Sequence, residues 1–370
     1  MTGDKLWKVS ISTLNCGRAF PFREEKHKQD VLRELMTSTD SNPQDIYVLG
    51  VQELVRIWEG VGKLRMETCL LDLSTAALEV LRQLFPDIQY KKLGYSYVGA
   101  TAVLVFCKDT IECYDSLSTT SNCGIFGSTL KGGTAYTFKL SQEGQEVQTF
   151  TFICCHLNAK EGRENKRARI DDFDRIMSQC NRVLDEAGFR KGHIFFFGDL
   201  NFRVTDTNVA PQDPNKWEET LWRSEELNRL KHKGIILRGF KEGRINFPPT
   251  YKYKLQSEST YNSKRIPSWC DRILYKKYHS AHNIGSCKYE SVRRSRTLQF
   301  TDHQAVNLVI EVPEITHDTI HDLELVRILE PLDATLGYLT DKILAYEWMR
   351  GPAIYIIGLI VVLWLLYRLF

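Results

Sequence analysis

One apolar run constrains the fold more than any other stretch of the chain. Residues 193–203 read HIFFFGDLNFR, so the apolar side chains stop abruptly at Gly198 and Asp199. Such a run is typical of a strand buried on both faces, although a buried helical turn has the same pattern. In a strand, Asp199 and Asn201 would point the same way and could hold a water, a phosphate or a metal. The alternative is a simple turn, because Asp and Asn are common turn formers.

Other strand-like segments also end in polar side chains. The segments 7–14, 45–51 and 148–155 are followed by such residues, and a pair of them precedes the segment 304–312. Carboxylate and amide oxygens suit a hard cation such as Mg²⁺, whereas a zinc site would need a His/Cys cluster with ligand spacing that this chain lacks. The polar residues at these ends are Asn15, Glu53, His156, Asp302 and His303.

Periodicity predicts an α/β chain organised as one large domain. Leucine spacing and charge predict helices near 27–36, 70–84, 165–187 and 217–233, and β-type sequence covers 95–106, 134–140, 148–155 and 271–275. No Gly/Ser- or Pro-rich linker occurs before about residue 312. We therefore expect one domain over 1–312, followed by a connector over 313–349.

Charge and cysteine content exclude some functional classes. The formal net charge of the 370 residues is only +3, whereas nucleic-acid-binding domains are usually strongly basic. The ten cysteines include no C-x-x-C pair, no Asn-x-Ser/Thr sequon occurs, and no apolar leader follows Met1. These features predict a reduced, cytosol-facing protein that binds no nucleic acid. We expect it to be a monomer.

The C-terminal segment differs from the rest of the chain. Residues 351–367 (GPAIYIIGLIVVLWLLY) are uncharged and apolar over about 17 residues, which is the lower limit for a transmembrane helix. They carry no polar stripe, as a core helix would. We interpret 350–370 as a C-terminal membrane anchor, with a buried helix or an apolar dimer contact as the alternatives. The short span favours a thin bilayer such as that of the endoplasmic reticulum.

Two motifs carry a resemblance to a known family. The chain contains GDLNFR at 198–203 and PSWCDRIL at 267–274, supported by NCG at 15–17, VQE at 51–53, CHLNA at 155–159, FPPTYK at 247–252 and TDH at 301–303. In this combination the chain resembles the inositol polyphosphate 5-phosphatases of the endonuclease/exonuclease/phosphatase superfamily. The resemblance covers about residues 7–312. With its apolar tail, the chain is most similar to tail-anchored members of the endoplasmic reticulum.

The resemblance implies a fold and a set of catalytic roles. The family fold is an α/β four-layer αββα sandwich like that of DNase I. Glu53 would hold Mg²⁺ with Asn15 beside it, and Asp302 would support the metal side. The catalytic residues would be Asp199, Asn201, Asp271, His156 and His303. Asp271 would orient His303, the two histidines would donate to phosphoryl oxygens, and either Asp199 or His303 would take the proton of the attacking water.

The resemblance also implies a substrate and a membrane contact. Tyr251, Lys252, Lys264, Arg265 and Asn158 would bind substrate phosphates, although the basic residues could instead form a solvated surface.

Ile125 and Phe126 in the loop 123–128 would enter the bilayer interface, with core packing as the alternative. We therefore expect Mg²⁺-dependent hydrolysis of the 5-phosphate of phosphatidylinositol 4,5-bisphosphate at a membrane. Hydrolysis of soluble inositol polyphosphates and a non-catalytic phosphoinositide-binding adaptor are the alternatives. Arg203 and Arg272 are expected to pair with carboxylates.

Overall fold

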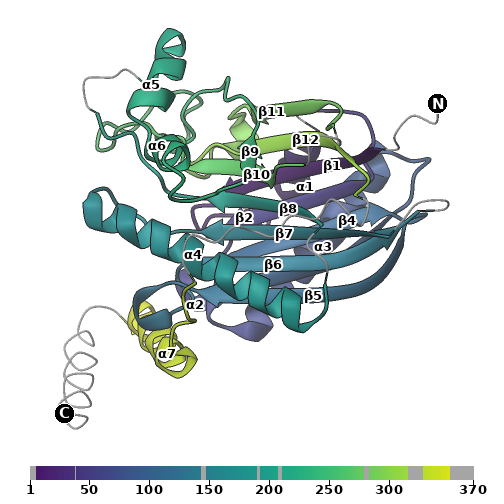
Figure 1. Ribbon diagram of the computed structural model, residues 1–370, viewed down its shortest axis with the longest axis horizontal. Coiled ribbons are helices and arrows are strands. Elements are labelled where there is room, and N and C mark those ends of the chain that lie inside the picture. The colour runs from purple at the N-terminus through teal and green to yellow at the C-terminus, as the bar shows by residue number, and fades with distance from the viewer. Residues whose placement is uncertain are drawn as a thin grey trace.

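Two mixed six-stranded sheets form the centre of the molecule (Figure 1). The computed structural model describes residues 6–37, 39–142, 147–189, 192–206, 211–278, 283–315 and 328–350. The first sheet has the strand order β11-β12-β1-β2-β4-β3 and the second the order β5-β6-β7-β8-β10-β9. Each sheet therefore mixes strands from the two halves of the chain, and neither can form until distant segments have met.

The first sheet is built around a parallel pair. β1 runs parallel to β2, and β12 pairs with β1 in the antiparallel direction. The strands are β1 (Leu6–Asn15), β2 (Ile46–Gln52), β3 (Tyr90–Val98), β4 (Thr101–Lys108), β11 (Cys287–Ser291) and β12 (Val306–Pro313).

The second sheet repeats this plan. β7 runs parallel to β8, and β10 pairs with β8 in the antiparallel direction. The strands are β5 (Glu112–Asn122), β6 (Gly132–Ser141), β7 (Gln148–His156), β8 (His193–Asp199), β9 (Phe240–Glu242) and β10 (Asp271–Lys276).

Helices cover the outer face of each sheet. The helices α1 (Glu25–Thr37) and α3 (Lys63–Leu84) cover the first sheet, and α4 (Arg163–Glu186) covers the second (Figure 1). Their buried apolar side chains belong to the same clusters as those of the sheets. A third apolar cluster lies between the two sheets. The predicted four-layer αββα arrangement is therefore confirmed. The remaining helices are α2 (Ile57–Gly60), η1 (Ile125–Gly127), η2 (Pro214–Lys216), α5 (Trp217–Arg223), α6 (Glu226–His232), η3 (Arg296–Leu298) and α7 (Ala334–Arg350).

The apolar run of 193–197 is the predicted doubly buried strand. Phe195 and Phe197 belong to the core between the sheets, whereas Ile194 and Phe196 belong to the core under α4. Successive side chains of a strand point to opposite faces, so a strand with a core on each side needs apolar residues at every position.

Several elements differ from the sequence prediction. The predicted long strand over 95–106 is a hairpin, with β3 and β4 joined at Gly99 and Ala100, where Gly99 has φ +53°. The predicted helix over 217–233 is two short helices, α5 and α6, separated by Ser224 and Glu225. At the first break the small residues Gly99 and Ala100 resemble their neighbours in hydrophobicity, and the reversal depends on backbone angles that hydrophobicity does not reveal. At the second, polar residues are common on the exposed face of a helix, so Ser224 and Glu225 do not by themselves mark an end.

The connector after β12 packs against the body. Ile315 exchanges hydrogen bonds with the Gln148 side chain, and the backbone N–H of Leu329 donates to Ser178 on α4. α7 then contacts α2 and η1 (Figure 1). Within the described ranges, no helix is both long and apolar enough to cross a bilayer. Of the predicted anchor, 350–370, only residue 350 is described, as the last residue of α7, and 351–370 lie outside the described residues.

Candidate active site

The carboxyl ends of both parallel strand pairs meet at one place. Asn15 at the end of β1 is in register with Gln52, and His156 at the end of β7 is in register with Asp199. Asp271, the first residue of β10, lies opposite Asp199. Ligands often bind at the carboxyl ends of adjacent strands, because the chain leaves the sheet there and exposes polar groups. Strand pairing thus gathers residues that are far apart in the sequence.

Gly198 is required by the close packing of β7 and β8. A Cβ atom at this position would lie 2.1 Å from the carbonyl oxygen of Cys155, and φ is +131°, which disfavours other residues. The glycine therefore allows β8 to deliver Asp199 to the end of the strand beside His156, as the sequence predicted.

Asp199 is a buried carboxylate at the centre of the site. It accepts hydrogen bonds from the Asn15 side chain at 2.9 Å and from the Asn201 backbone at 3.0 Å. The Nε2 atoms of His156 and His303 lie 3.3 and 3.9 Å from its Oδ2 atom. Burial alone would raise the pKa of Asp199, but the two imidazoles outweigh it and hold the pKa well below its usual range. The group is therefore ionised.

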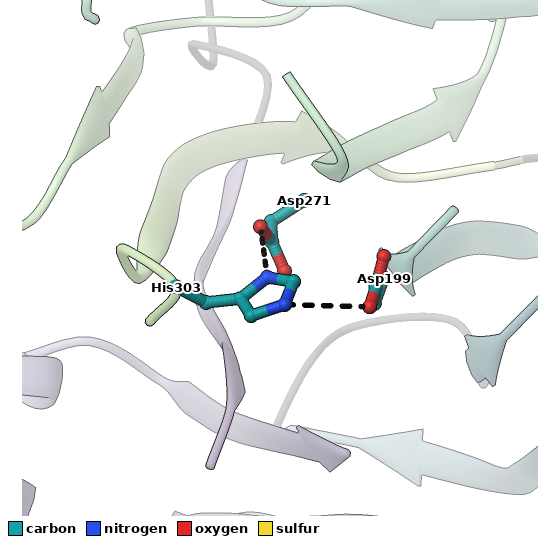
Figure 2. A group of neighbouring side chains, drawn as sticks. All are labelled: Asp199, Asp271 and His303. Atoms are coloured by element: carbon teal, nitrogen blue, oxygen red, sulfur yellow. Dashed lines mark hydrogen bonds and ion pairs between the residues drawn. The ribbon is translucent and has the colours of Figure 1, made fainter. Parts of the chain in front are cut away.

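Asp271 orients His303 (Figure 2). Its Oδ2 atom accepts the Nδ1–H of His303 at 2.9 Å and the hydroxyl of Thr250 at 2.7 Å, and the other ring nitrogen of His303 faces Asp199. Burial alone would lower the pKa of His303, but the carboxylates of Asp271 and Asp199 outweigh it and raise the pKa to about 9. The imidazole is therefore charged at neutral pH, as the predicted pairing requires.

Asn201 lies in the site, but not by strand alternation. β8 ends at Asp199, and Asn201 has φ +55° beyond the strand. Its side chain donates to the Leu157 carbonyl at 3.1 Å and accepts from the guanidinium of Arg203. Arg203 also donates to the Asn201 carbonyl at 3.0 Å and stacks on Tyr251. The expectation that Arg203 pairs with a carboxylate is therefore wrong for its side chain, which holds the loop after β8 instead.

Lys131 reaches the site from the loop before β6. Its ammonium group donates to the Nε2 atom of His156. The negative charges of the Asp199 and Glu53 carboxylates favour the protonated form of this lysine. Burial and the nearby lysine charge lower the pKa of His156, and they outweigh the raising effect of Asp199 and Glu53. Sequence reasoning assigned the loop to the membrane and missed this contact. The signal was available in Lys131-Gly132-Gly133, where two glycines open the strand that follows the lysine.

Glu53 supplies a carboxylate at the rim of the site. It forms an ion pair with Arg18 at 2.8 Å, and its side chain is 25% exposed. Burial would raise its pKa, but His156, Lys131 and Arg18 outweigh this effect and lower it. The amide oxygen of Asn15 already accepts one hydrogen bond, from the backbone N–H of Gly17 at 3.0 Å. An ionised, partly accessible carboxylate is a donor that fits a hard cation such as Mg²⁺.

A second group of potential metal donors fits a cation less well. Among the described residues, Asp199, Asp271 and His303 have ligand atoms within 4.8 Å of one another. The Nδ1–H of His303 is already donated to Asp271, and the raised pKa keeps the other ring nitrogen protonated. A protonated imidazole offers no lone pair, so the cluster is arranged for hydrogen bonding rather than for coordination.

Lys252 and Asp302 are brought together as an ion pair. The lysine was assigned to substrate and the aspartate to the metal side, and each is half-buried. The ring of Tyr251 packs against that of His303 with centroids 4.4 Å apart, which places the Tyr251-Lys252 pair directly beside this imidazole. The assigned roles of these residues remain predictions.

The other predicted phosphate-binding residues lie around the rim. Lys264 and Arg265 are exposed, and Arg265 faces Glu161 at 3.6 Å on the loop that follows β7. Asn158, on the same loop, is half-buried and donates its backbone N–H to Asp172 at 2.8 Å. The loops 156–162 and 262–266 thus meet on one side of the site.

Ile125 and Phe126 are on the surface. Their exposed fractions are 66% and 61%, and they form most of η1. Core packing, the alternative considered for these side chains, is therefore wrong. The loop that carries them continues through Thr129 to Lys131, so the exposed apolar pair and the active-site lysine share one segment.

Comparison with known families and relatives agrees with the motifs. The model of endonuclease/exonuclease/phosphatase family 2 matches residues 13–309. Phosphatidylinositol 3,4,5-trisphosphate 5-phosphatase 2 of Homo sapiens is 32% identical over 261 residues, covering 65% of this chain and 19% of the relative. Synaptojanin-1 of Rattus norvegicus is 25% identical over 289 residues, covering 73% and 18%. The chain thus spans about a fifth of the length of these relatives.

Solved structures share the fold. The inositol polyphosphate 5-phosphatase domain of SPsynaptojanin, in complex with inositol (1,4)-bisphosphate and calcium ion, superposes with a TM-score of 0.63 at 23% identity, covering 93% of this chain and 89% of that one. Cimex nitrophorin in its ferrous NO complex also superposes, with a TM-score of 0.55 at 18% identity, covering 83% and 99%. Because such different proteins share it, the fold alone does not assign a function.

The family assignment rests on the sequence match together with the site. The match spans Asn15, Glu53, His156, Asp199, Asp271 and His303, and the structure gathers these residues at one edge of the two sheets. The resemblance to 5-phosphatases drawn from the motifs is thereby confirmed. The chain belongs to endonuclease/exonuclease/phosphatase family 2.

Proposed function

We propose that the protein is a Mg²⁺-dependent phosphatase that removes the 5-phosphate of phosphatidylinositol 4,5-bisphosphate at a membrane surface. The observation that carries the proposal is the ionised Asp199 carboxylate beside the Asp271–His303 pair, in a chain whose relatives include a phosphoinositide 5-phosphatase. The relatives' substrates are properties of those longer proteins, so the substrate of this chain is part of the proposal.

The site can divide the chemistry between a carboxylate and a charged imidazole. Phosphoryl transfer depends mainly on positioning and on stabilising charge at the phosphoryl oxygens. His303, charged and held by Asp271, has a proton to donate to a phosphoryl oxygen but no lone pair with which to accept one. Asp199 is then the group that orients the attacking water and takes its proton. Lys131 adds positive charge beside His156.

The metal would be held by carboxylate and amide oxygens around Asp199 and His303. Glu53 provides the ionised carboxylate and Asn15 the neighbouring amide, with Asp302 as a further carboxylate near His303. Bound Mg²⁺ would polarise a phosphoryl oxygen and stabilise the leaving alkoxide. The Glu53 carboxylate is paired with Arg18, and we expect this ion pair to open when the cation binds.

Substrate choice would depend on the basic side chains at the rim. Tyr251 packs against His303, and Lys252 is the next residue in the chain. Lys264 and Arg265 are exposed on the adjoining loop. An inositol ring with its 5-phosphate at Asp199 would present its 4-phosphate to this cluster, where Lys acts as a point charge and Arg as a bidentate donor.

Membrane attachment is the second part of the proposal. The apolar run 351–367 follows α7 in the sequence, and Ile125 and Phe126 project from η1. We propose that the run is a tail anchor in the endoplasmic reticulum membrane with the catalytic domain on the cytosolic side as a monomer. A tether of this kind raises the effective concentration of enzyme over lipid.

A substrate panel tests the proposal. The full-length chain is incubated with vesicles that carry phosphatidylinositol 4,5-bisphosphate, 3,4,5-trisphosphate or 4-phosphate, and with soluble inositol 1,4,5-trisphosphate. Phosphate release is measured with Mg²⁺ and with EDTA. We expect release from the 4,5-bisphosphate vesicles only with Mg²⁺, and phosphatidylinositol 4-phosphate as the lipid product.

Each alternative gives a different result in this panel. Faster turnover of soluble inositol 1,4,5-trisphosphate than of vesicles would favour a soluble substrate. Vesicle binding without Mg²⁺-dependent release would indicate a non-catalytic adaptor. The variant Phe126→Asp should slow turnover on vesicles and leave turnover of the soluble substrate unchanged, because only the vesicle assay requires the exposed ring.

A further inference from the structure

The C-terminal helix α7 packs on η1, which lies in the loop that leads to Lys131. Among the residues of α7 whose burial is described, the buried ones are Gly337, Asp341 and Ala345. Their spacing of four residues places them on one face of the helix. Leu336, Tyr338, Leu339 and Tyr346 are exposed instead.

Gly337 sets how closely the helix approaches the loop. A Cβ atom at this position would lie 2.1 Å from the carbonyl oxygen of Gly127 and 2.6 Å from its carbonyl carbon. Both atoms are backbone, so neither can rotate away. The helix therefore rests directly on the backbone of η1, and any larger residue at 337 would push the two apart.

Asp341 bonds to the loop itself. Its carboxylate is 3% exposed, and its two oxygens share the backbone N–H of Thr129, each at 3.0 Å. Burial raises the pKa of Asp341, against the lowering effect of the Thr129 N–H. Burying a carboxylate costs free energy unless it is hydrogen-bonded. The bond from Thr129 is therefore needed at this contact, and it fixes the position of α7 relative to Thr129.

Thr129 is two residues from the active-site lysine. The backbone carbonyl of Lys131 accepts the N–H of Cys123 at 2.8 Å, which closes the loop 123–131, and its ammonium group reaches His156. The loop thus has α7 on one side and the catalytic histidine on the other. A shift of Thr129 would be passed to Lys131 through a single intervening residue.

We propose that α7 is a positioning element of the active site. Asp341, through the backbone of Thr129, holds the loop 123–131 so that the Lys131 ammonium stays against His156. The proposal rests on the phosphatase function proposed above, and it makes Asp341 a positioning residue rather than a catalytic one. It gives the segment between the catalytic domain and the apolar tail a role in catalysis.

A double-mutant cycle tests this link in the full-length chain. The variants Asp341→Ala, Lys131→Ala and the double variant are assayed on soluble inositol 1,4,5-trisphosphate, so that membrane binding does not enter. We expect Asp341→Ala to lower kcat/KM about 10-fold, because small misplacements of a charged group are costly in catalysis. We expect the double variant to be no slower than Lys131→Ala, because residues that act through one another are not additive.

Two further variants separate positioning from simple stability. Asp341→Asn keeps one oxygen acceptor for Thr129 and should recover most of the loss. Lys342→Ala, on the exposed side of the same helix, where the lysine lies over Tyr338, should behave as wild type. Additive losses in the double variant, or an unchanged kcat/KM in a less stable Asp341→Ala, would overturn the proposal.

Hydrogen–deuterium exchange gives a readout that does not depend on activity. The amides of 129–133 should exchange faster in Asp341→Ala than in wild type or Lys342→Ala. Unchanged exchange would show that α7 does not hold the loop. If the wild-type chain released no phosphate, the proposed function would fail on its own account, and exchange would then decide whether α7 orders this loop.

Discussion

Asp199 is kept ionised by its neighbours rather than by water. The carboxylate is buried, it accepts hydrogen bonds from Asn15 and the Asn201 backbone, and its charge is opposed mainly by His303. A charge buried in this way is stable only while its partners stay in place. Even a conservative substitution of Asp199 or of one of these partners should therefore disturb the site.

The variant Asp199→Asn should abolish most of the phosphatase activity. It keeps the size of the side chain but removes the negative charge and the proton acceptor, so we expect kcat to fall by about 10²–10⁴-fold or more. Phosphate release from phosphatidylinositol 4,5-bisphosphate vesicles measures the effect. The exposed Asp87→Asn is the matched control and should keep full activity. Similar activity in both variants would remove Asp199 from the mechanism.

The raised pKa of His303 predicts a pH-dependent stability. Its pKa is about 9 in the folded protein and about 6.5 in an unfolded chain, so the folded state binds the proton more tightly. The stabilisation is fully present below pH 6.5 and is lost progressively as pH rises through about 9. The midpoint of thermal unfolding, measured between pH 6 and pH 10, should fall over this range.

The variant Asp271→Asn serves as the control for this pH effect. It removes the carboxylate that favours the charged imidazole, so the pKa of His303 should move back toward 6.5. Its thermal midpoint should then change less between pH 6.5 and 9 than that of the wild type. A parallel decline in both proteins would assign the effect to other groups.

At the scale of elements, one arginine joins β10, β9 and α6. The guanidinium of Arg272 pairs with Glu242 on β9 at 2.6 and 2.7 Å and lies 3.5 Å from Glu225. Glu225 also caps α6 by accepting the N–H groups of Leu227 and Asn228. The expected pairing of Arg272 with carboxylates is confirmed. This network fixes the strand whose first residue is Asp271.

The variant Arg272→Met should destabilise the fold strongly. It leaves the buried carboxylate of Glu225 without a cation and Glu242 with Lys231 alone, which should lower the free energy of unfolding by about 3–5 kcal/mol. Urea denaturation measures the change. The exposed pair Arg293–Glu258 provides the control, since Arg293→Met should cost less than about 1 kcal/mol. Equal losses would mean that the buried network is not a structural joint.

At the scale of the whole molecule, the active site and the proposed membrane contacts lie on one continuous path. The loop 123–131 carries the exposed Ile125 and Phe126 and then Lys131, and α7 packs on the same loop before the sequence enters the apolar run. A membrane that contacts this side of the molecule would therefore touch the loop 123–131, which also carries Lys131.

The paired substitution Val361→Arg and Val362→Arg should detach the protein from membranes. Each charge at the centre of a membrane span costs about 2.5–3.5 kcal/mol on insertion. Fractionation of cells that express the full-length chain should move the double variant from the membrane pellet to the supernatant. Val361→Leu with Val362→Leu keeps the apolar character and should stay in the pellet. A charged variant that remained there would argue against the tail anchor.

The amino-acid sequence by itself determined the class of the fold and most of the site. The apolar run at 193–197 predicted β8, and the strand-like segments 7–14, 45–51 and 148–155 predicted β1, β2 and β7. The polar residues that follow these segments are Asn15, Glu53, His156 and Asp199. These features are local, since a strand's burial and its last residue can both be read along the chain.

Only the tertiary structure decided how these residues work together. Strand pairing brought Asp271 opposite Asp199, the neighbouring carboxylates charged His303, and the loop before β6 placed Lys131 on His156. The same is true of α7, whose contact with Thr129 could not be read from its composition. Charge states and loop contacts depend on burial and on partners that are distant in sequence, and folding alone supplies both.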